Sequence, residues 1–392
     1  MMNVDRHSLI LGLSYALDIA GKNNLSHSKN TAYLSALIAR EIELNKDEAL
    51  GIYYAALLHD IGINDEYILG IVNETDMKKH CFIGEEMLKK LPLPHEIPAY
   101  VLYHHEYYDG SGAFELSGES IPKGAQIICF ASEFDDLFAK VNNFNNDSFL
   151  KVCNWLGRKK TLFSEEIVTA FSRLIEREYF LLDYFNHETK YMLSDKIIFS
   201  DNVYYGSEDI KKFALCFADI IDQRSPFTFN HSTGIAELAK RAAAYLGYND
   251  EIQNKMYIAG LLHDIGKLHV LPEILHKNDK LTPEERFEIN KHTYFTRKIL
   301  ERIKGFEEIV DLAANHHEKL DGTGYPYRMT GEQLSELEKV MAVCDVYQAL
   351  SEERPYRSKL PQEKVWAIIG DMAAENKHLD KSLVEKIKQM LK

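Results

Sequence analysis

The apolar positions of this chain recur at helical spacing. In the segment "STGIAELAKRAAAYLGY", Ile235, Leu238 and Ala242 lie three or four residues apart on one face, and Gly247 ends the pattern. The segment "LTPEERFEINKH" opens with Thr282 as a helix N-cap, followed by a proline and, three residues on, a glutamate. Alternating strand patterns and glycine-rich hairpin turns are scarce. The pattern predicts an all-α fold.

The chain carries the same helical pattern twice. The letters LLHDIG occupy residues 57–62 and again residues 261–266. Around them, histidines recur at the same two intervals, 32 and 24 residues. The matched pairs are His27 with His59 and His231 with His263, then His80 with His104 and His292 with His316. An adjacent histidine and an Asp-Gly pair follow in both copies, as "HHEYYDGSG" and "HHEKLDGTG", so the sequence predicts a duplicated unit.

The repeat predicts two tandem helical domains. The letters "KVCNWL" of the first copy resemble "KVWAII" of the second, which places the end of the first unit near residue 180. The aromatic and partly polar stretch between the copies is typical of a helical linker. We expect a first domain over residues 1–180, a linker over 181–208 and a second domain over 209–392.

Charge and cysteine content restrict the partners and the compartment. The net charge of −14 disfavours a nucleic-acid polymer as partner and leaves a small phosphorylated ligand open. The five cysteines lack CxxC spacing, which disfavours a disulfide framework or a thiolate zinc site. No apolar run approaches the ~20 residues that span a bilayer. We expect a cytoplasmic protein that does not cross a membrane.

The second copy contains seven side chains that ligate metals. They are His231, His263, Asp264, His292, His316, His317 and Asp345. Imidazoles with two carboxylates suit iron, manganese, zinc or nickel better than calcium or magnesium. Because one metal takes about four to six ligands, the set predicts a pair of metals with Asp264 between them. Such a pair suits phosphodiester hydrolysis.

A structural role for these histidines is the competing interpretation. A single histidine on an apolar helix is ordinarily a satisfied core or surface residue. The doublet of His263 and Asp264, however, lies in an apolar run where unpaired polar groups are costly, and the whole set recurs at matched spacing. We therefore favour metal binding. Lys267 is predicted to face the same centre and to contact a phosphate, the alternative being a solvated helix end.

The motifs of the second copy resemble the HD superfamily of metal-dependent phosphohydrolases, and more narrowly its HD-GYP subfamily. They are "HDIGK", "HHEKLDGTGYP" and "DVYQALSEERPYR", and the resemblance runs from about residue 209 to the C-terminus. It implies an enzyme of second-messenger signalling, a phosphodiesterase that hydrolyses a cyclic dinucleotide. Cyclic di-GMP would be opened to pGpG or cut on to GMP, and cyclic GMP-AMP is the other substrate implied. The implied cofactors are two divalent transition metals, iron or manganese before nickel or zinc.

The same resemblance assigns roles to individual residues. One metal would be held by His231, His263, Asp264 and Asp345, and the other by Asp264, His292, His316 and His317. Asp264 and Lys267 would serve catalysis, while Tyr325 and Arg354 would lie near the substrate.

Two positions of the second copy depart from the family pattern. Phe227 stands where members with three metals carry a glutamate, which favours two metals. Gln348 stands where the family usually has a further aspartate. We expect this glutamine beside the metal ligands, with activity retained.

The first copy is predicted to be a degenerate site. Its remaining ligands are His27, His59, Asp60, His80, His104 and His105. Ser132 stands in place of the last aspartate unless Glu133 or Asp135 replaces it, Ile63 replaces the lysine, and no GYP triplet follows. We expect hydrolysis in the second copy alone, with the first copy binding metal, regulating or supporting a homodimer.

Two alternatives to this enzyme stay open. One is a nucleotide-binding sensor or signalling scaffold without turnover, which Gln348 and the degenerate first copy motivate. The other is an HD phosphohydrolase of a different nucleotide, which the GYP stretch disfavours.

Overall fold

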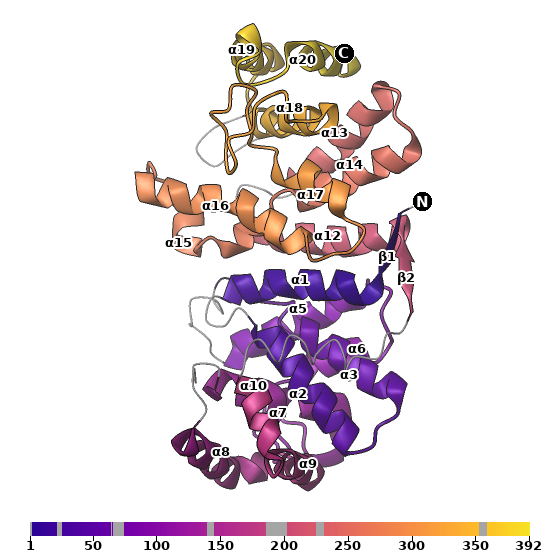
Figure 1. The fold of residues 1–392 in the computed structure, drawn as a ribbon, viewed down its shortest axis with the longest axis vertical. Helices are drawn as coiled ribbons and strands as arrows, with labels where there is room; N and C mark the ends of the chain where they lie inside the picture. The colour runs from indigo at the N-terminus through magenta and orange to yellow at the C-terminus, as the bar shows by residue number, and fades with distance from the viewer. Residues whose placement is uncertain are drawn as a thin grey trace. The chain divides into compact units, whose positions relative to one another are not determined.

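The computed structural model describes most of the chain as helices. The described residues are 2–21, 26–63, 65, 74–138, 145–185, 202–224, 231–352 and 359–392. Within these ranges the strands are β1 (Asn3–Asp5) and β2 (Tyr204–Gly206), which pair antiparallel (Figure 1). The predicted all-α fold is confirmed. Among the described residues, no helix combines the length and apolar character needed to cross a membrane.

The chain folds as two compact units. The C-terminal unit comprises Met1–Ala16 with Val203–Lys392, and the N-terminal unit comprises Leu17–Asn202. The boundaries expected from the sequence differ at the start of the chain, because residues 1–16 join the C-terminal unit. There β1 pairs with β2, and Gly12 of α1 (Arg6–Gly21) packs so closely on Ile303 that a Cβ would lie 2.4 Å from Ile303 Cγ1. Of the predicted linker, residues 186–201 lie outside the described residues.

Both units repeat one succession of helices. The N-terminal unit contains α2 (His27–Glu41), α3 (Lys46–Leu58), α5 (Glu74–Leu88), α6 (Ile97–Leu102), α7 (Lys123–Phe138), α8 (Asn146–Lys159), α9 (Glu165–Ile175) and α10 (Glu178–Phe185). The C-terminal unit contains α12 (Ser207–Gln223), α13 (His231–Tyr245), α14 (Asp250–Leu262), α15 (Pro272–Leu275), α16 (Pro283–Leu300), α17 (Glu307–Ala314), α18 (Glu336–Ser351), α19 (Gln362–Met372) and α20 (Lys381–Met390). Short 3-10 turns are η1 (Gly118–Ser120), η2 (Lys160–Leu162), η3 (Ile265–His269) and η4 (Ala374–Asn376).

Polar caps fix where the key helices begin. Thr282 accepts a hydrogen bond from the Glu285 backbone N–H, and the Glu285 side chain returns one to the Thr282 N–H, as the sequence predicts. Asn45 and Asn249 cap α3 and α14 at equivalent places. These caps set the register of the two helices that lead into the LLHDIG stretches.

The core of each unit is built on three packed helices. In the N-terminal unit α2 packs on α3 and α7, and in the C-terminal unit α13 packs on α14 and α18 (Figure 1). Their inward residues are fully buried, among them Ile52, Phe134, Ile258 and Val343. In each core the first histidine begins one helix, α2 or α13. The His-Asp doublet follows the end of the helix packed on it, α3 or α14.

The His-Asp doublets follow the helices instead of lying within them. Helix α3 ends at Leu58 and α14 at Leu262, and in the C-terminal unit the chain tightens at once into η3. Lys267 therefore does not lie on the helix that leads into the doublet. A 3-10 turn places it instead, with the Lys267 N–H donating to the Asp264 carbonyl at 2.8 Å.

Candidate metal centre and active site

The glycine after each doublet lets two helices meet at the site. A Cβ on Gly266 would lie 1.9 Å from the carbonyl oxygen of His292 on α16, and one on Gly62 would lie 2.1 Å from that of His80 on α5. Only glycine permits an approach this close. The repeated Gly thus brings each doublet against the helix that carries the next histidine.

Backbone carbonyls orient the imidazoles of the C-terminal unit. Nδ1 of His263, His292 and His316 lies 2.7–2.8 Å from the carbonyl oxygen three residues earlier. Since a carbonyl can only accept, Nδ1 carries the proton and Nε2 presents its lone pair. This is the arrangement that a metal-ligating histidine requires.

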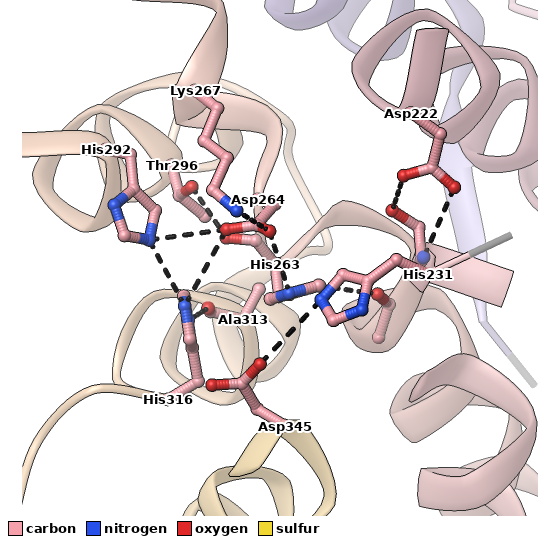
Figure 2. Close-up of polar contacts among 12 residues, drawn as sticks. Asp222, His231, His263, Asp264, Lys267, His292, Thr296, Ala313, His316 and Asp345 are labelled. Atoms are coloured by element: carbon pink, nitrogen blue, oxygen red, sulfur yellow. Dashed lines mark hydrogen bonds and ion pairs between the residues drawn. The ribbon is translucent and has the colours of Figure 1, made fainter. Parts of the chain in front are cut away.

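Asp264 lies at the centre of these rings (Figure 2). Its Oδ1 is 3.3 Å from His292 Nε2 and 3.9 Å from His316 Nε2. Its Oδ2 is 3.2 Å from His263 Nε2 and 2.5 Å from Lys267 Nζ. Each carboxylate oxygen therefore faces a different group of ligands, as expected of a bridging residue.

The remaining predicted ligands close the other side of the site. Asp345 of α18 places Oδ1 3.9 Å from His231 Nε2 and Oδ2 3.6 Å from His317 Nδ1. The Tyr325 ring lies beside that of His317, with centroids 4.9 Å apart. Two compact groups result, in each of which the ligand atoms lie within 4.8 Å of one another. They are His231, His263 and Asp264, and His292, His316 and His317.

The protonation states suit metal binding. Burial lowers the pKa of His292 to about 4 and that of His316 to about 3, so both rings are neutral near pH 7. Burial opposes ionisation of Asp264, but neighbouring His263 and Lys267 outweigh it and hold its pKa well below the usual range. The neutral rings of His292 and His316 beside an ionised carboxylate fit a divalent transition metal. Burial disfavours the charged form of His263, whereas Asp264 outweighs it and raises the pKa of this ring.

The N-terminal unit assembles its histidines in the same way. His59 and His104 point Nδ1 at the carbonyls of Ala56 and Val101, at 2.8 and 2.6 Å. Asp60 places one oxygen 3.4 Å from His59 Nε2 and the other 3.4 Å from His80 Nε2. All six predicted ligands of this unit fall into two groups, His27 with His59 and Asp60, and His80, His104 and His105 together with Cys81.

On the His27 side of that site, both ring nitrogens of His27 face hydrogen-bonding side chains. Ser132 Oγ lies 3.3 Å from His27 Nε2, where the other unit presents a carboxylate. Asp135 binds the opposite nitrogen, Nδ1, at 2.9 Å, and Glu133 instead contacts the Tyr107 hydroxyl and Lys159. Burial disfavours the charged form of His27, but Asp135 outweighs it and raises the pKa of the ring to about 10. Neither acidic residue takes the place of the missing ligand.

The glutamate after each histidine pair has a role that sequence analysis missed. Glu318 accepts backbone hydrogen bonds from Tyr327 at 2.7 Å and Met329 at 2.9 Å, which clamps the loop that follows Tyr325. Glu106 clamps the matching loop through two backbone N–H groups. The signal was available, since the third letter of "HHE" is the same in both copies.

A pair of aspartates was also missed. Asp222 of α12 accepts from the Ser232 N–H and hydroxyl, and Asp18 accepts from the Ser28 N–H. Each serine follows the first histidine of its unit, so the aspartate fixes the helix start that carries this histidine. Two other residues that carry predictions, Arg354 and Phe227, lie outside the described residues.

A known protein family matches most of the chain. The sequence pattern of the HD domain matches residues 16–149 and again residues 216–383. The chain belongs to the HD domain family. The predicted membership of the HD superfamily is therefore confirmed, and the family pattern matches both units.

Several phosphodiesterases are similar to this chain in sequence. The chain is 31% identical over 380 residues to the 3'3'-cGAMP-specific phosphodiesterase 1 of Vibrio cholerae, and the alignment covers 94% of this chain and 88% of that protein. The chain is 28% identical to the 3'3'-cGAMP-specific phosphodiesterase 3 of the same organism, and the alignment covers 75% of this chain and 63% of that protein. A cyclic di-GMP phosphodiesterase of Pseudomonas aeruginosa is 38% identical over 158 residues, 39% of this chain and 37% of its own.

A solved structure has the same fold as this chain. The crystal structure of a cyclic GMP-AMP-specific phosphodiesterase of V. cholerae superposes with a TM-score of 0.72 at 21% identity, covering 99% of this chain and 98% of that one. At this identity the similarity concerns the fold alone.

Proposed function

We propose that the C-terminal unit is a metal-dependent phosphodiesterase of the HD-GYP type that hydrolyses a cyclic dinucleotide, with 3'3'-cGAMP the first candidate and cyclic di-GMP the second. The observation that carries the proposal is the convergence of Asp264, the six other ligands and Lys267 at one place. The near full-length similarity to a 3'3'-cGAMP-specific phosphodiesterase supports the order of the substrates.

The proposed ligands form two sets that share one carboxylate. His231, His263, Asp264 and Asp345 would hold one metal, and Asp264, His292, His316 and His317 the other. Iron and manganese suit this nitrogen-rich set, with nickel and zinc as alternatives. When bound, such a pair activates water and polarises the phosphoryl oxygens.

The remaining side chains bind and orient the substrate. Lys267 Nζ lies 2.5 Å from Asp264 Oδ2 and is partly exposed, so its ammonium faces the place where an anionic phosphate would enter. Tyr325, whose ring lies beside that of His317, would form part of the wall of the site. Arg354 is proposed as a further substrate contact on sequence grounds alone.

The N-terminal unit is proposed to be inactive in hydrolysis. It presents buried Ile63 where the active copy has Lys267, and Ser132 where it has Asp345. Its catalytic cation and one ligand are thus absent. The expected homodimer and cytoplasmic location stay predictions.

Product analysis tests the proposal. Purified protein is loaded with Mn²⁺ or Fe²⁺ under reducing conditions and incubated with 3'3'-cGAMP, cyclic di-GMP and cyclic di-AMP in parallel. We expect linear products from 3'3'-cGAMP or cyclic di-GMP and none from the Asp264→Ala variant. Intact nucleotides after incubation with demonstrably metal-loaded protein would refute it, and tight binding without turnover would favour the sensor.

A further inference from the structure

We infer that the N-terminal unit holds one divalent transition-metal ion, on His80, His104, His105 and Asp60, and that this ion takes no part in hydrolysis. The inference does not depend on the activity proposed for the other unit. It rests on how these four side chains are buried and on the unpartnered ring nitrogens of His104 and His105.

Two ring nitrogens of this cluster are unsatisfied. Nε2 of His104 and Nε2 of His105 are buried and have no hydrogen-bond partner. Buried nitrogens of this kind are costly unless a proton donor or a cation satisfies them. A shared cation satisfies both at once, because His104 already uses Nδ1 for the Val101 carbonyl.

The rings of the cluster match those of the C-terminal site. Centroids of His80 and His104 are 5.3 Å apart and those of His104 and His105 are 4.0 Å apart. The corresponding separations in the other unit, His292 to His316 and His316 to His317, are 5.3 and 4.1 Å. The first cluster is therefore as compact as the centre proposed for catalysis.

Two further groups lie near this ligand set. Cys81 belongs to the same compact group, but the atom of His104 nearest its Sγ is Nδ1, at 4.0 Å, the nitrogen that faces the Val101 carbonyl. His27 is committed to Asp135 and faces the Ser132 hydroxyl, which is a poor ligand for transition metals. The unit thus offers a complete set for one ion and an incomplete set for a second.

Metal content measures this inference directly. The full-length chain is equilibrated with Mn²⁺, freed of unbound ion and analysed by mass spectrometry. Changing half-exposed His105 to Gln is expected to remove one ion per chain. Asp60→Asn is expected to have the same effect, and it serves as a second variant in case the first fails to fold. Exposed His95→Gln is the control. Loss of one ion in either folded variant supports the inference, and unchanged metal content in the folded variants overturns it.

A second inference concerns the C-terminal unit and rests on the metal centre proposed there. We propose that Glu352 is a positioning residue, which holds the ring of His231 through the nitrogen opposite the metal. His231 Nδ1 lies 2.7 Å from Glu352 Oε2, and Gln348 Nε2 donates to Glu352 Oε1 at 2.6 Å. Glutamine and glutamate thus form a short chain that ends at a metal ligand.

His231 needs such a partner because of its place in the fold. The other oriented histidines bind a carbonyl three residues earlier, but His231 is the first residue of α13, so this helix offers it no earlier carbonyl. His27, the first residue of α2, has the same need and uses Asp135. Both units therefore orient their first histidine with a carboxylate.

The two units take this carboxylate from different positions. Asp135 and Gln348 are equivalent, each three residues after the last ligand position of its helix. Asp135 also accepts from Asn30, whose counterpart is Gly234. A Cβ on Gly234 would lie 2.2 Å from Gln348 Nε2, so the glycine makes room for the longer glutamine. Where the N-terminal unit has Asp135, the C-terminal unit has Gln348. Gly234 makes room for this longer side chain, and Glu352 supplies the carboxylate that holds the first histidine.

Metal affinity and rescue test the role of Glu352. Changing it to Gln keeps the volume but removes the charge, and we expect Mn²⁺ to bind the C-terminal unit about tenfold more weakly. Adding Gln348→Asp and Gly234→Asn to this variant recreates the arrangement of the other unit and is expected to restore affinity. Exposed Glu363→Gln is the matched control.

The outcomes separate this inference from the proposed function. Unchanged Mn²⁺ affinity in a folded Glu352→Gln variant overturns the positioning role, and so does weakening that the added aspartate fails to rescue. A wild-type C-terminal unit that binds no Mn²⁺ contradicts the metal centre itself and with it both proposals. Titrations without nucleotide keep these results independent of turnover.

Discussion

The two units are built on the same turn but differ in what it can do. Gly62 and Gly266 pack a doublet against the next helix, and Glu106 and Glu318 clamp the loop after the paired histidines. Beyond this shared frame, the N-terminal unit has lost a carboxylate and a cation and holds His27 by hydrogen bonds. The comparison teaches that ligand geometry follows from packing, whereas hydrolysis needs a few further polar side chains that packing does not require.

The largest effect is expected at the central carboxylates. Asp264→Asn alters the carboxylate whose two oxygens face the two ligand groups of the C-terminal unit at 3.2 and 3.3 Å, so hydrolysis should fall by about 10³-fold or more. Asp60→Asn should cost less than about tenfold by the same assay. Steady-state product formation measures both variants. Equal losses would show that the N-terminal unit takes part in the reaction.

Lys267 is expected to matter next. Lys267→Met removes the ammonium beside Asp264 but keeps every proposed metal ligand, and kcat/KM should fall by about 10²-fold while metal content stays constant. Ile63→Lys, the reverse change in the other unit, should add no activity because Ser132 remains. A gain of hydrolysis in a chain that carries both Ile63→Lys and Asp264→Asn would contradict the assignment.

The loop clamps should affect stability in both units and substrate binding in one. Glu318→Gln keeps one acceptor where two backbone N–H groups need partners, so the free energy of unfolding should fall by about 1–3 kcal/mol. Glu106→Gln should cost a similar amount. Only the first variant should also raise KM, since its loop carries Tyr325. Thermal unfolding and substrate titration separate the two effects, and a raised KM in both variants would refute the distinction.

The smallest change concerns the missing ligand. Ser132→Asp places a carboxylate near His27 Nε2, now 3.3 Å from the serine hydroxyl, and should raise metal content by up to one ion per chain. Hydrolysis should not rise, because Ile63 still occupies the place of the lysine. Metal analysis and product assays check both statements, and unaltered metal content would mean that Asp135 keeps His27 from serving as a ligand.

Much of the site could be predicted from the sequence because repeats carry spatial information. Two histidines at the same interval in two copies belong to the same place in the fold, so the candidate ligands and the contrast of Lys267 with Ile63 followed from the sequence alone. Periodicity likewise predicted the helices and the Thr282 cap. The seven ligands of the C-terminal unit do meet at one place, while their binding of metal stays a proposal.

Other features depend on contacts between distant segments. No local pattern shows that residues 1–16 join the C-terminal unit, because this follows from the pairing of β1 with β2 and the packing of Gly12 on Ile303. Nor does spacing reveal that Glu352 replaces the aspartate lost at Gln348. Such substitutions act across 100 residues or more of chain, where sequence periodicity carries no signal.

The sequence by itself determined the helical class, the duplication and the ligand types, since these depend on residue identity and on local spacing. The tertiary structure alone decided which nitrogen of each histidine faces the centre and which carboxylate holds its opposite side. Those choices depend on hydrogen bonds to carbonyls and to remote side chains. Their geometry exists only once the helices have packed.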